Sequence, residues 1–145
     1  MDDEVAKFTN EQIVPASPGV VGLHHIRIPV ADISAAEYWF AQTFGFETVL
    51  ITEDEDRVTG ALIRHDSGLF IGLHGAAEPS AALEGFAVIG LTVSDIELWP
   101  SYLDAKGTGR SEVFDGHLGK FLRVYGPNGL VVEIHTPVQP SAEDA

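Results

Sequence analysis

An internal repeat is the feature of this 145-residue sequence that most constrains its fold. Val93-Ser94-Asp95-Ile96 echoes Val30-Ala31-Asp32-Ile33 at an offset of 93 − 30 = 63 residues. Asp66-Ser67-Gly68-Leu69 corresponds to Pro127-Asn128-Gly129-Leu130 at an offset of 129 − 68 = 61 residues. A unit that recurs at such spacing is one supersecondary module that cannot bury its own sheet alone. Two modules are therefore expected to pair into one structure.

Hydrophobic periodicity predicts the same order of elements in both modules. In the first, Asp32 is a plausible N-cap and Gly45 a plausible stop for the helix. We predict a strand over 23–30, a helix over 33–44 and strands over 46–52, 58–65 and 68–74. In the second, we predict a strand over 86–93, a helix ending near residue 105 that is irregular at Pro100, and strands near 110–114, 118–125 and 130–135. The predicted fold class is α+β, with two β-α-β-β-β modules forming a cup-shaped curved sheet.

The ends of the chain differ in composition from its middle. Residues 1–19 are polar and contain Pro15 and Pro18, which predicts a flexible N-terminal arm. Residues 20–137 are predicted to be a single domain, with module one over 20–78 and module two over 84–137. Small residues between the modules indicate a linker, and residues 138–145 are predicted to be a disordered tail.

Composition excludes several classes of function. The net charge of −14 argues against a nucleic-acid or anionic-membrane partner. The chain has no Cys, which excludes a disulfide framework, a thiol nucleophile and a thiolate metal site. No apolar run is long enough to span a membrane, and the N-terminal Met-Asp-Asp-Glu does not resemble a signal peptide. We expect a cytoplasmic protein whose partner is a small-molecule substrate or drug.

Glu133 is the candidate functional residue in the predicted strand over 130–135. Pro127-Asn128-Gly129 is a tight-turn signal, because Asn and Gly tolerate the positive φ that such turns need. Alternation after the turn places Val131, Glu133 and His135 on one face of the strand. A carboxylate among so many apolar neighbours is unfavourable without a partner, so Glu133 is expected to have one.

These motifs resemble the vicinal oxygen chelate superfamily, which includes glyoxalase I, extradiol dioxygenases and the fosfomycin- and bleomycin-resistance proteins. The matching pieces lie at 23–32, 44–46 and 126–134, and the resemblance covers roughly residues 21–137. It implies a cup in which a divalent metal is held by the first and last strands of each module. Carried onto this chain, the four ligand positions are His25, Gly72, Val88 and Glu133, of which only His25 and Glu133 have side chains that can coordinate.

Other polar residues are predicted to share the cup. His74 and His135 each lie two residues beyond a ligand position, so His74 or His135 is a candidate third ligand beside His25 and Glu133. Such a set suits Zn, Ni, Fe, Mn or Co, and the alternative is a cup without metal. Arg27 and Arg123 are candidates for binding an anionic substrate, or for neutralising Glu133. His135 and His117 are further substrate-binding candidates, whereas His24 is expected to face away.

Two functions remain open from the sequence. The first is a small-molecule enzyme with isomerase, lyase or epimerase chemistry, in which Glu133 and His25 are catalytic through an enolate-like or alkoxide intermediate. Extradiol ring cleavage fits less well, because Val88 occupies a ligand position. The alternative is a drug-sequestering protein of the bleomycin-resistance type, in which Trp39, Trp99 and Phe114 are candidates for stacking on the drug. A homodimer is expected in either case.

Overall fold

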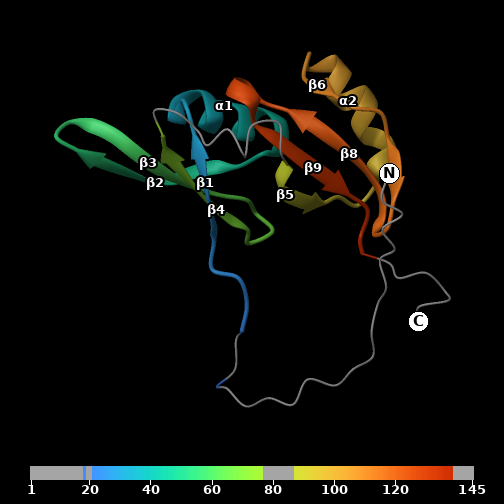
Figure 1. Ribbon diagram of the computed structural model, residues 1–145, viewed down its shortest axis with the longest axis horizontal. Helices are drawn as coiled ribbons and strands as arrows, with labels where there is room; N and C mark the ends of the chain where they lie inside the picture. The colour runs from blue at the N-terminus through green and yellow to red at the C-terminus, as the bar shows by residue number, and fades with distance from the viewer. Residues whose placement is uncertain (1–17, 19–20, 77–86, 139–145) are drawn as a thin grey trace, which may run out of the picture.

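Two β-α-β-β-β modules follow one another in the computed structural model, which describes residues 18, 21–76 and 87–138 (Figure 1). Each module forms its own mixed sheet, and the helix α1 lies between the two sheets (Figure 1). The predicted fold class and the repeat are thereby confirmed. The predicted arm (1–19) and tail (138–145) lie almost wholly outside the described residues, as does most of the linker, and these boundaries stay predictions.

Module one contains a four-stranded sheet, here called sheet A. Its elements are β1 (Ile26–Val30), α1 (Ile33–Phe44), β2 (Glu47–Asp54), β3 (Arg57–Arg64) and β4 (Phe70–Gly75). The strands lie in the order β1-β4-β3-β2, with β1 parallel to β4 and the other pairs antiparallel. This order leaves one edge of β1 unpaired within the described residues.

Module two repeats this arrangement in sheet B. Its elements are β5 (Ala87–Thr92), η1 (Ile96–Leu98), α2 (Trp99–Ala105), β6 (Gly109–Arg110), β7 (Phe114–Gly116), β8 (Gly119–Tyr125), η2 (Pro127–Gly129) and β9 (Val131–His135). The order is β5-β9-β8-β6, β7 also pairs with β8, and β5 runs parallel to β9. The edge strand β5 therefore corresponds to β1.

The ends of α1 lie where the sequence predicts them. The Asp32 side chain accepts a hydrogen bond from the Ala35 backbone N–H at 3.0 Å, and Gly45 ends the helix with a φ of 79°. In module two, Pro100 lies in the first turn of α2, where its missing N–H is tolerated, and the irregular part is the preceding turn η1. Within the described residues, no helix has the length and apolar character needed to cross a membrane.

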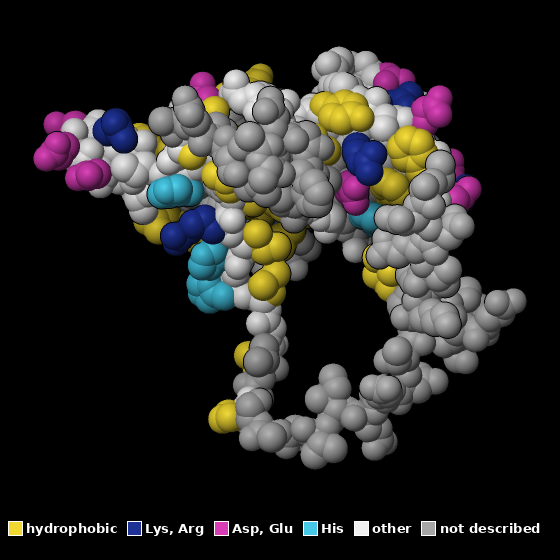
Figure 2. Space-filling model, viewed as in Figure 1, with side chains coloured by type: hydrophobic (Ala, Val, Ile, Leu, Met, Phe, Trp, Pro, Cys, Tyr) yellow, Lys and Arg dark blue, Asp and Glu magenta, His cyan; other side chains and the backbone are white. Residues whose placement is uncertain are grey.

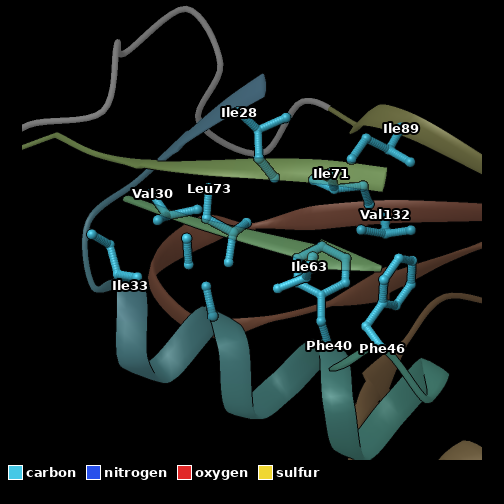
Figure 3. Packing of buried hydrophobic residues seen from close by; sticks show 12 residues of the cluster. Ile28, Val30, Ile33, Phe40, Phe46, Ile63, Ile71, Leu73, Ile89 and Val132 are labelled. Carbon is cyan, nitrogen blue, oxygen red and sulfur yellow. The ribbon is translucent and has the colours of Figure 1, made fainter. Parts of the chain in front are cut away.

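One hydrophobic core joins the two modules. Phe40 of α1 and the nearby Phe46 pack against buried residues of sheet A, among them Ile63 and Ile71 (Figure 3). Ile89 of β5 and Val132 of β9 belong to the same cluster (Figure 3). A second cluster lies between α2 and sheet B, and Trp39 and Phe44 of α1 reach it. The opposite face of each sheet is consequently left for polar side chains.

The strand predicted over 110–114 is wrong as a single element. The chain instead forms β6 and β7, with residues 111–113 outside any strand. The cause is Ser111, whose hydroxyl oxygen accepts the backbone N–H of Arg123 at 2.8 Å and whose own N–H donates to the Arg123 carbonyl at 2.9 Å. A side chain thus replaces a backbone acceptor, and the strand is interrupted there.

A bidentate salt bridge joins α2 to β6. The Arg110 guanidinium donates to both carboxylate oxygens of Asp104, from Nε at 2.9 Å and from Nη2 at 2.8 Å. These hydrogen bonds to Arg110 hold the pKa of the Asp104 carboxyl below its ordinary value of 3.8. They also raise the pKa of Arg110, which stays charged.

We predict that Asp104→Asn lowers the thermal stability of the chain at neutral pH and not in acid. The folded-state pKa of Asp104 is depressed, so its stabilising contribution is present above the unfolded value near 3.8 and is lost as pH falls through the folded value. Unfolding temperatures of parent and variant measured from neutral pH into acid should therefore converge. A constant difference in unfolding temperature across that pH range contradicts the assignment. Asp115→Asn, in the exposed strand β7, is the matched control.

Candidate functional site

Adjacent strands of sheet B bring the polar residues of module two together. In the antiparallel pairing of β8 with β9, Arg123 lies opposite Glu133 and Phe121 lies opposite His135. Alternation puts these four side chains on one face, while Leu122, Val132 and Ile134 point into the core. We call Arg123, Glu133, His135 and Phe121 the β8/β9 site.

Glu133 has the partners that its position requires. One carboxylate oxygen, Oε1, lies 2.9 Å from Nε2 of His135, and the other, Oε2, accepts from Nε of Arg123 at 3.3 Å. The side chains of Glu133 and His135 are about one-fifth exposed, at 22% and 21%. The arrangement holds a carboxylate between an imidazole and a guanidinium at a partly desolvated surface. Among the described residues, the Arg123 side chain donates a hydrogen bond only from Nε, so its terminal nitrogens have no partner there.

Aromatic rings form a wall beside these charges. The rings of Phe121 and His135 stack with centroids 5.2 Å apart and an interplanar angle of 17°. The Arg123 guanidinium carbon lies 5.7 Å from the Phe121 ring centroid, and Phe114, which is 40% exposed, packs 5.6 Å from Phe121. Stacking fixes the plane of the imidazole, which is the orientation a proton-transfer group needs.

Gly90 of the edge strand β5 makes room for His135. Gly90 lies opposite Glu133 in the parallel pairing of β5 with β9. A Cβ placed on Gly90 would lie 3.3 Å from Cδ2 and 3.4 Å from Nε2 of His135. The imidazole is therefore laid against the β5 backbone, with Phe121 on its other side. Sequence reasoning missed Gly90, Phe121 and Ser111, although Phe121 alternates with Arg123 and could have been found by extending that pattern.

Sheet A carries the polar residues of module one. Arg27 pairs with Gly72 in the parallel register of β1 with β4, and a Cβ on Gly72 would lie 3.6 Å from the His25 ring and 3.7 Å from Arg27. His74 lies two residues along β4 from Gly72 and so faces the same side. We call His25, Arg27, Gly72 and His74 the β1/β4 face.

The sequence predicted that His24 faces away. In the structure its ring instead contacts the ring of His25. The Nδ1 atoms of His24 and His25 lie 2.8 Å apart, a hydrogen bond in which one ring donates and the other accepts. His25 precedes β1 by one residue, outside the regular pairing of the strand, and this lets the two neighbouring rings meet.

The β1/β4 face and the β8/β9 site are separate groups on the single chain. Figure 2 shows His and basic side chains gathered near β1 and β4, and a second group of acidic, basic and His side chains over β8 and β9. In the described part of the chain, no hydrogen bond or ion pair joins the two groups, and no three His, Asp or Glu side chains group closely enough to hold a metal. His117 lies exposed in the turn between β7 and β8, away from these contacts.

Comparison with known proteins identifies the family. The family model described as the glyoxalase/bleomycin resistance protein/dioxygenase superfamily matches residues 22–134. The chain belongs to this superfamily. No curated protein sequence matches it.

Solved structures of low sequence identity share the fold. TnmS3, an antibiotic binding protein from Streptomyces sp. CB03234, has a TM-score of 0.68 at 15% identity, covering 83% of this chain and 99% of that one. A mutant of the fosfomycin resistance protein FosX from Listeria monocytogenes, complexed with Mn(II) and 1S,2S-dihydroxypropylphosphonic acid, has a TM-score of 0.63 at 15% identity, covering 87% and 95%. A glyoxalase family protein from Enterococcus faecalis has a TM-score of 0.64 at 20% identity, covering 79% and 96%.

Gly90→Ala is predicted to loosen the hydrogen bond between His135 and Glu133. The added methyl group meets the imidazole at 3.3 Å, which is closer than ordinary van der Waals contact, so the ring must move. NMR signals of the His135 ring should shift on substitution. Gly72→Ala is the matched control, because its Cβ would meet the His25 ring at an ordinary 3.6 Å. Unmoved His135 signals in Gly90→Ala contradict the packing described above.

Proposed function

We propose that this protein is a small-molecule enzyme of the vicinal oxygen chelate type that performs isomerase, lyase or epimerase chemistry by acid/base catalysis. The observation that carries the proposal is the Glu133 carboxylate, whose two oxygens are held by His135 and Arg123 on an open sheet face. A set of ionisable groups gathered beside an aromatic wall is more typical of a reacting or ligand-binding site than of a packing surface.

His135 is the proton acceptor in this proposal. When Nε2 carries the ring proton and donates it to Glu133, Nδ1 has a free lone pair. Nδ1 then removes a proton from the carbon beside a substrate carbonyl, and the electron pair of that C–H bond moves to the carbonyl oxygen as an enolate. Glu133 stabilises the imidazolium that forms. Return of the proton from His135 regenerates the substrate, so epimerisation requires a proton from a second acid on the opposite face, a role open to His25 of the second copy. Expulsion of a neighbouring leaving group from the enolate gives a lyase.

Arg123 stabilises the charge that develops on the substrate. Its Nε is bound to Glu133, which fixes the guanidinium, and its remaining nitrogens can donate to an enolate, alkoxide or carboxylate oxygen. Phe121 and Phe114 supply the apolar wall for the rest of the substrate. The low polarity of that wall strengthens the interaction of Arg123 with an oxyanion.

We further propose that the complete cup forms between two copies of the chain. The β1/β4 face contributes His25 and Arg27, which are complementary in charge to Glu133 of a second copy. The edge strand β1 is unpaired on one side in the described residues, so this edge can lie against the second copy. This arrangement joins the two groups of polar residues that a single chain keeps apart.

A divalent metal does not fit the β8/β9 site of one chain. Both Glu133 oxygens already have hydrogen-bond partners, and among the described residues no three His, Asp or Glu side chains group closely enough to form a ligand set. For this reason no step above involves a metal. The metal-assisted alternative adds His25 of the second copy to Glu133, with His74 or His135 as the third ligand, and is tested by metal analysis of protein purified without chelator.

A drug-sequestering function is the second candidate. The aromatic row of Phe114, Phe121 and His135, with Arg123 over Phe121, supports it because such a row can stack on a flat drug without any chemistry. The net charge of −14 would attract a cationic compound. Of the predicted stacking residues, Trp39 and Trp99 lie away from the β8/β9 site, and only Phe114 lies at it.

Glu133→Gln separates the enzyme from the drug-binding protein. A ligand that co-purifies with the parent is identified by native mass spectrometry, and its conversion is followed by NMR. We expect Glu133→Gln to lower the rate by about 100-fold or more while changing affinity little, because the substitution nearly keeps the shape but removes the charge that supports His135. Glu112→Gln, at an exposed position, is the control. No turnover in the parent, with unchanged ligand affinity in the variant, contradicts the enzyme and supports sequestration.

A cup formed between two copies of the chain, here called the shared cup, predicts a dimer whose stability depends on Arg27. Sedimentation equilibrium should give a mass twice the chain mass of 15.6 kDa. Arg27→Glu places a negative charge opposite Glu133 of the second copy and should shift the equilibrium toward monomer. Lys106→Glu, just after α2, makes the same change of charge away from both faces and should leave the dimer intact. A monomeric parent chain contradicts the shared cup.

A further inference from the structure

A cavity lies between the two modules, next to the β8/β9 site, and Gly90 contributes to both. Its volume is about 510 Å³, which is within the range of small-molecule pockets. Its lining comes from both modules: Phe44, Phe46 and His65 from module one, and Leu91, Thr92 and Trp99 from module two. None of Arg123, Glu133, His135 or Phe121 contributes to it.

Aromatic rings form the walls of this cavity. Phe44 and Trp99 face each other with centroids 5.8 Å apart and planes inclined by 34°, and Phe46 lies 5.3 Å from the His65 ring. Phe44 ends α1 and Phe46 lies two residues after it, whereas His65 directly follows β3 and Trp99 begins α2. A flat ring that enters the cavity is offered aromatic faces from both modules, which favours stacking over aliphatic packing.

The edge of β5 supplies unpaired backbone groups at the same cavity. Val93 donates its N–H to the His135 carbonyl at 2.8 Å, so residues 91 and 93 point their backbone groups toward β9. Alternation then directs the N–H and C=O of Gly90 and Thr92 to the opposite side, and both residues line the cavity. Among the described residues β5 pairs with β9 alone. A donor and an acceptor on one strand edge match the acceptor and donor of an amide group.

The cavity is neutral in a strongly acidic chain. The chain has 22 Asp and Glu residues, and none of those that the structure describes lines the cavity. Among the described lining residues, His65 is the one titratable side chain, and its Nδ1 accepts the backbone N–H of Ser67 at 3.1 Å. An ionised ligand would lose its hydration in this cavity without gaining an opposite charge, which disfavours anions and cations alike.

We propose that this inter-module cavity is a second binding site, for a neutral planar aromatic ring that bears an amide or lactam group. The ring stacks against Phe44 and Trp99, which are only partly buried, and the amide pairs with the β5 edge at Gly90 and Thr92. The proposal does not depend on the function assigned to the β8/β9 site. Because the lining comes from both modules, a ligand here also holds the modules together.

Three small probes test the chemistry of the site. Benzamide is the neutral aromatic amide, benzoate has the same ring with a negative charge, and cyclohexanecarboxamide has the same amide without aromaticity. NMR spectra of the ¹⁵N-labelled full chain should show benzamide binding with a dissociation constant of about a few millimolar, as its small size implies. The Trp99 indole signal and the Gly90 and Thr92 amides should shift, whereas the indole signal of Trp39, outside the cavity, should not. Benzoate and cyclohexanecarboxamide should each bind about tenfold more weakly or worse.

Two matched variants place the probe in the cavity. Ser94 lines the cavity and is exposed, so Ser94→Phe fills the space with little effect on folding, and it should weaken benzamide binding about tenfold or more. Ser101→Phe, exposed on α2 outside the cavity, should bind benzamide as the parent does. The proposal is overturned by equal binding of benzoate or cyclohexanecarboxamide, by shifts confined to Glu133, His135 and Arg123, or by no shift with benzamide.

Discussion

An ionised carboxylate on an otherwise apolar strand needs partners, and the structure around β9 supplies them to Glu133. The antiparallel register with β8 brings Arg123 opposite, and the two-residue period of the strand brings His135 to the same face. Each partner satisfies one oxygen. Because the imidazole is stacked on Phe121 and lies against Gly90, the pairing also fixes the orientation of a proton-transfer group. The same contacts that make burial of the carboxylate tolerable thus create a reactive arrangement.

The repeat explains why the polar groups are divided. Each module uses one face of its sheet for the shared core, where Phe40 and Phe46 meet Ile89 and Val132, and leaves the other face to polar side chains. His25 and Arg27 occupy that face in module one, whereas Gly90 occupies the place of Arg27 in module two. The two modules thus differ in these side chains, with a basic face in module one and a face with a carboxylate in module two. Two such faces from two copies complement one another, and this is the basis of the proposed dimer.

Local chemistry determined which features could be predicted from the sequence. The limits of α1 follow from Asp32 and Gly45, whose capping and left-handed preferences act within a few residues. The two-residue period of a strand was enough to predict that Glu133 and His135 lie on the same face of the sheet. The broken strand at Ser111 could not be predicted, because its partner Arg123 is brought beside it only by the pairing of β8. The stack of Phe121 on His135 likewise depends on register, which hydrophobic alternation alone does not fix.

The absence of Cys from the sequence allows the most direct test of the shared cup. Chains that carry His25→Cys and chains that carry Glu133→Cys are mixed, allowed to exchange subunits and treated with a short bis-maleimide. The account predicts a covalent dimer that contains one chain of each kind, because His25 of one copy faces Glu133 of the other. The absence of a cross-linked dimer in the mixture would contradict it, as would efficient cross-linking within a separate chain that carries both substitutions when the mixture gives none.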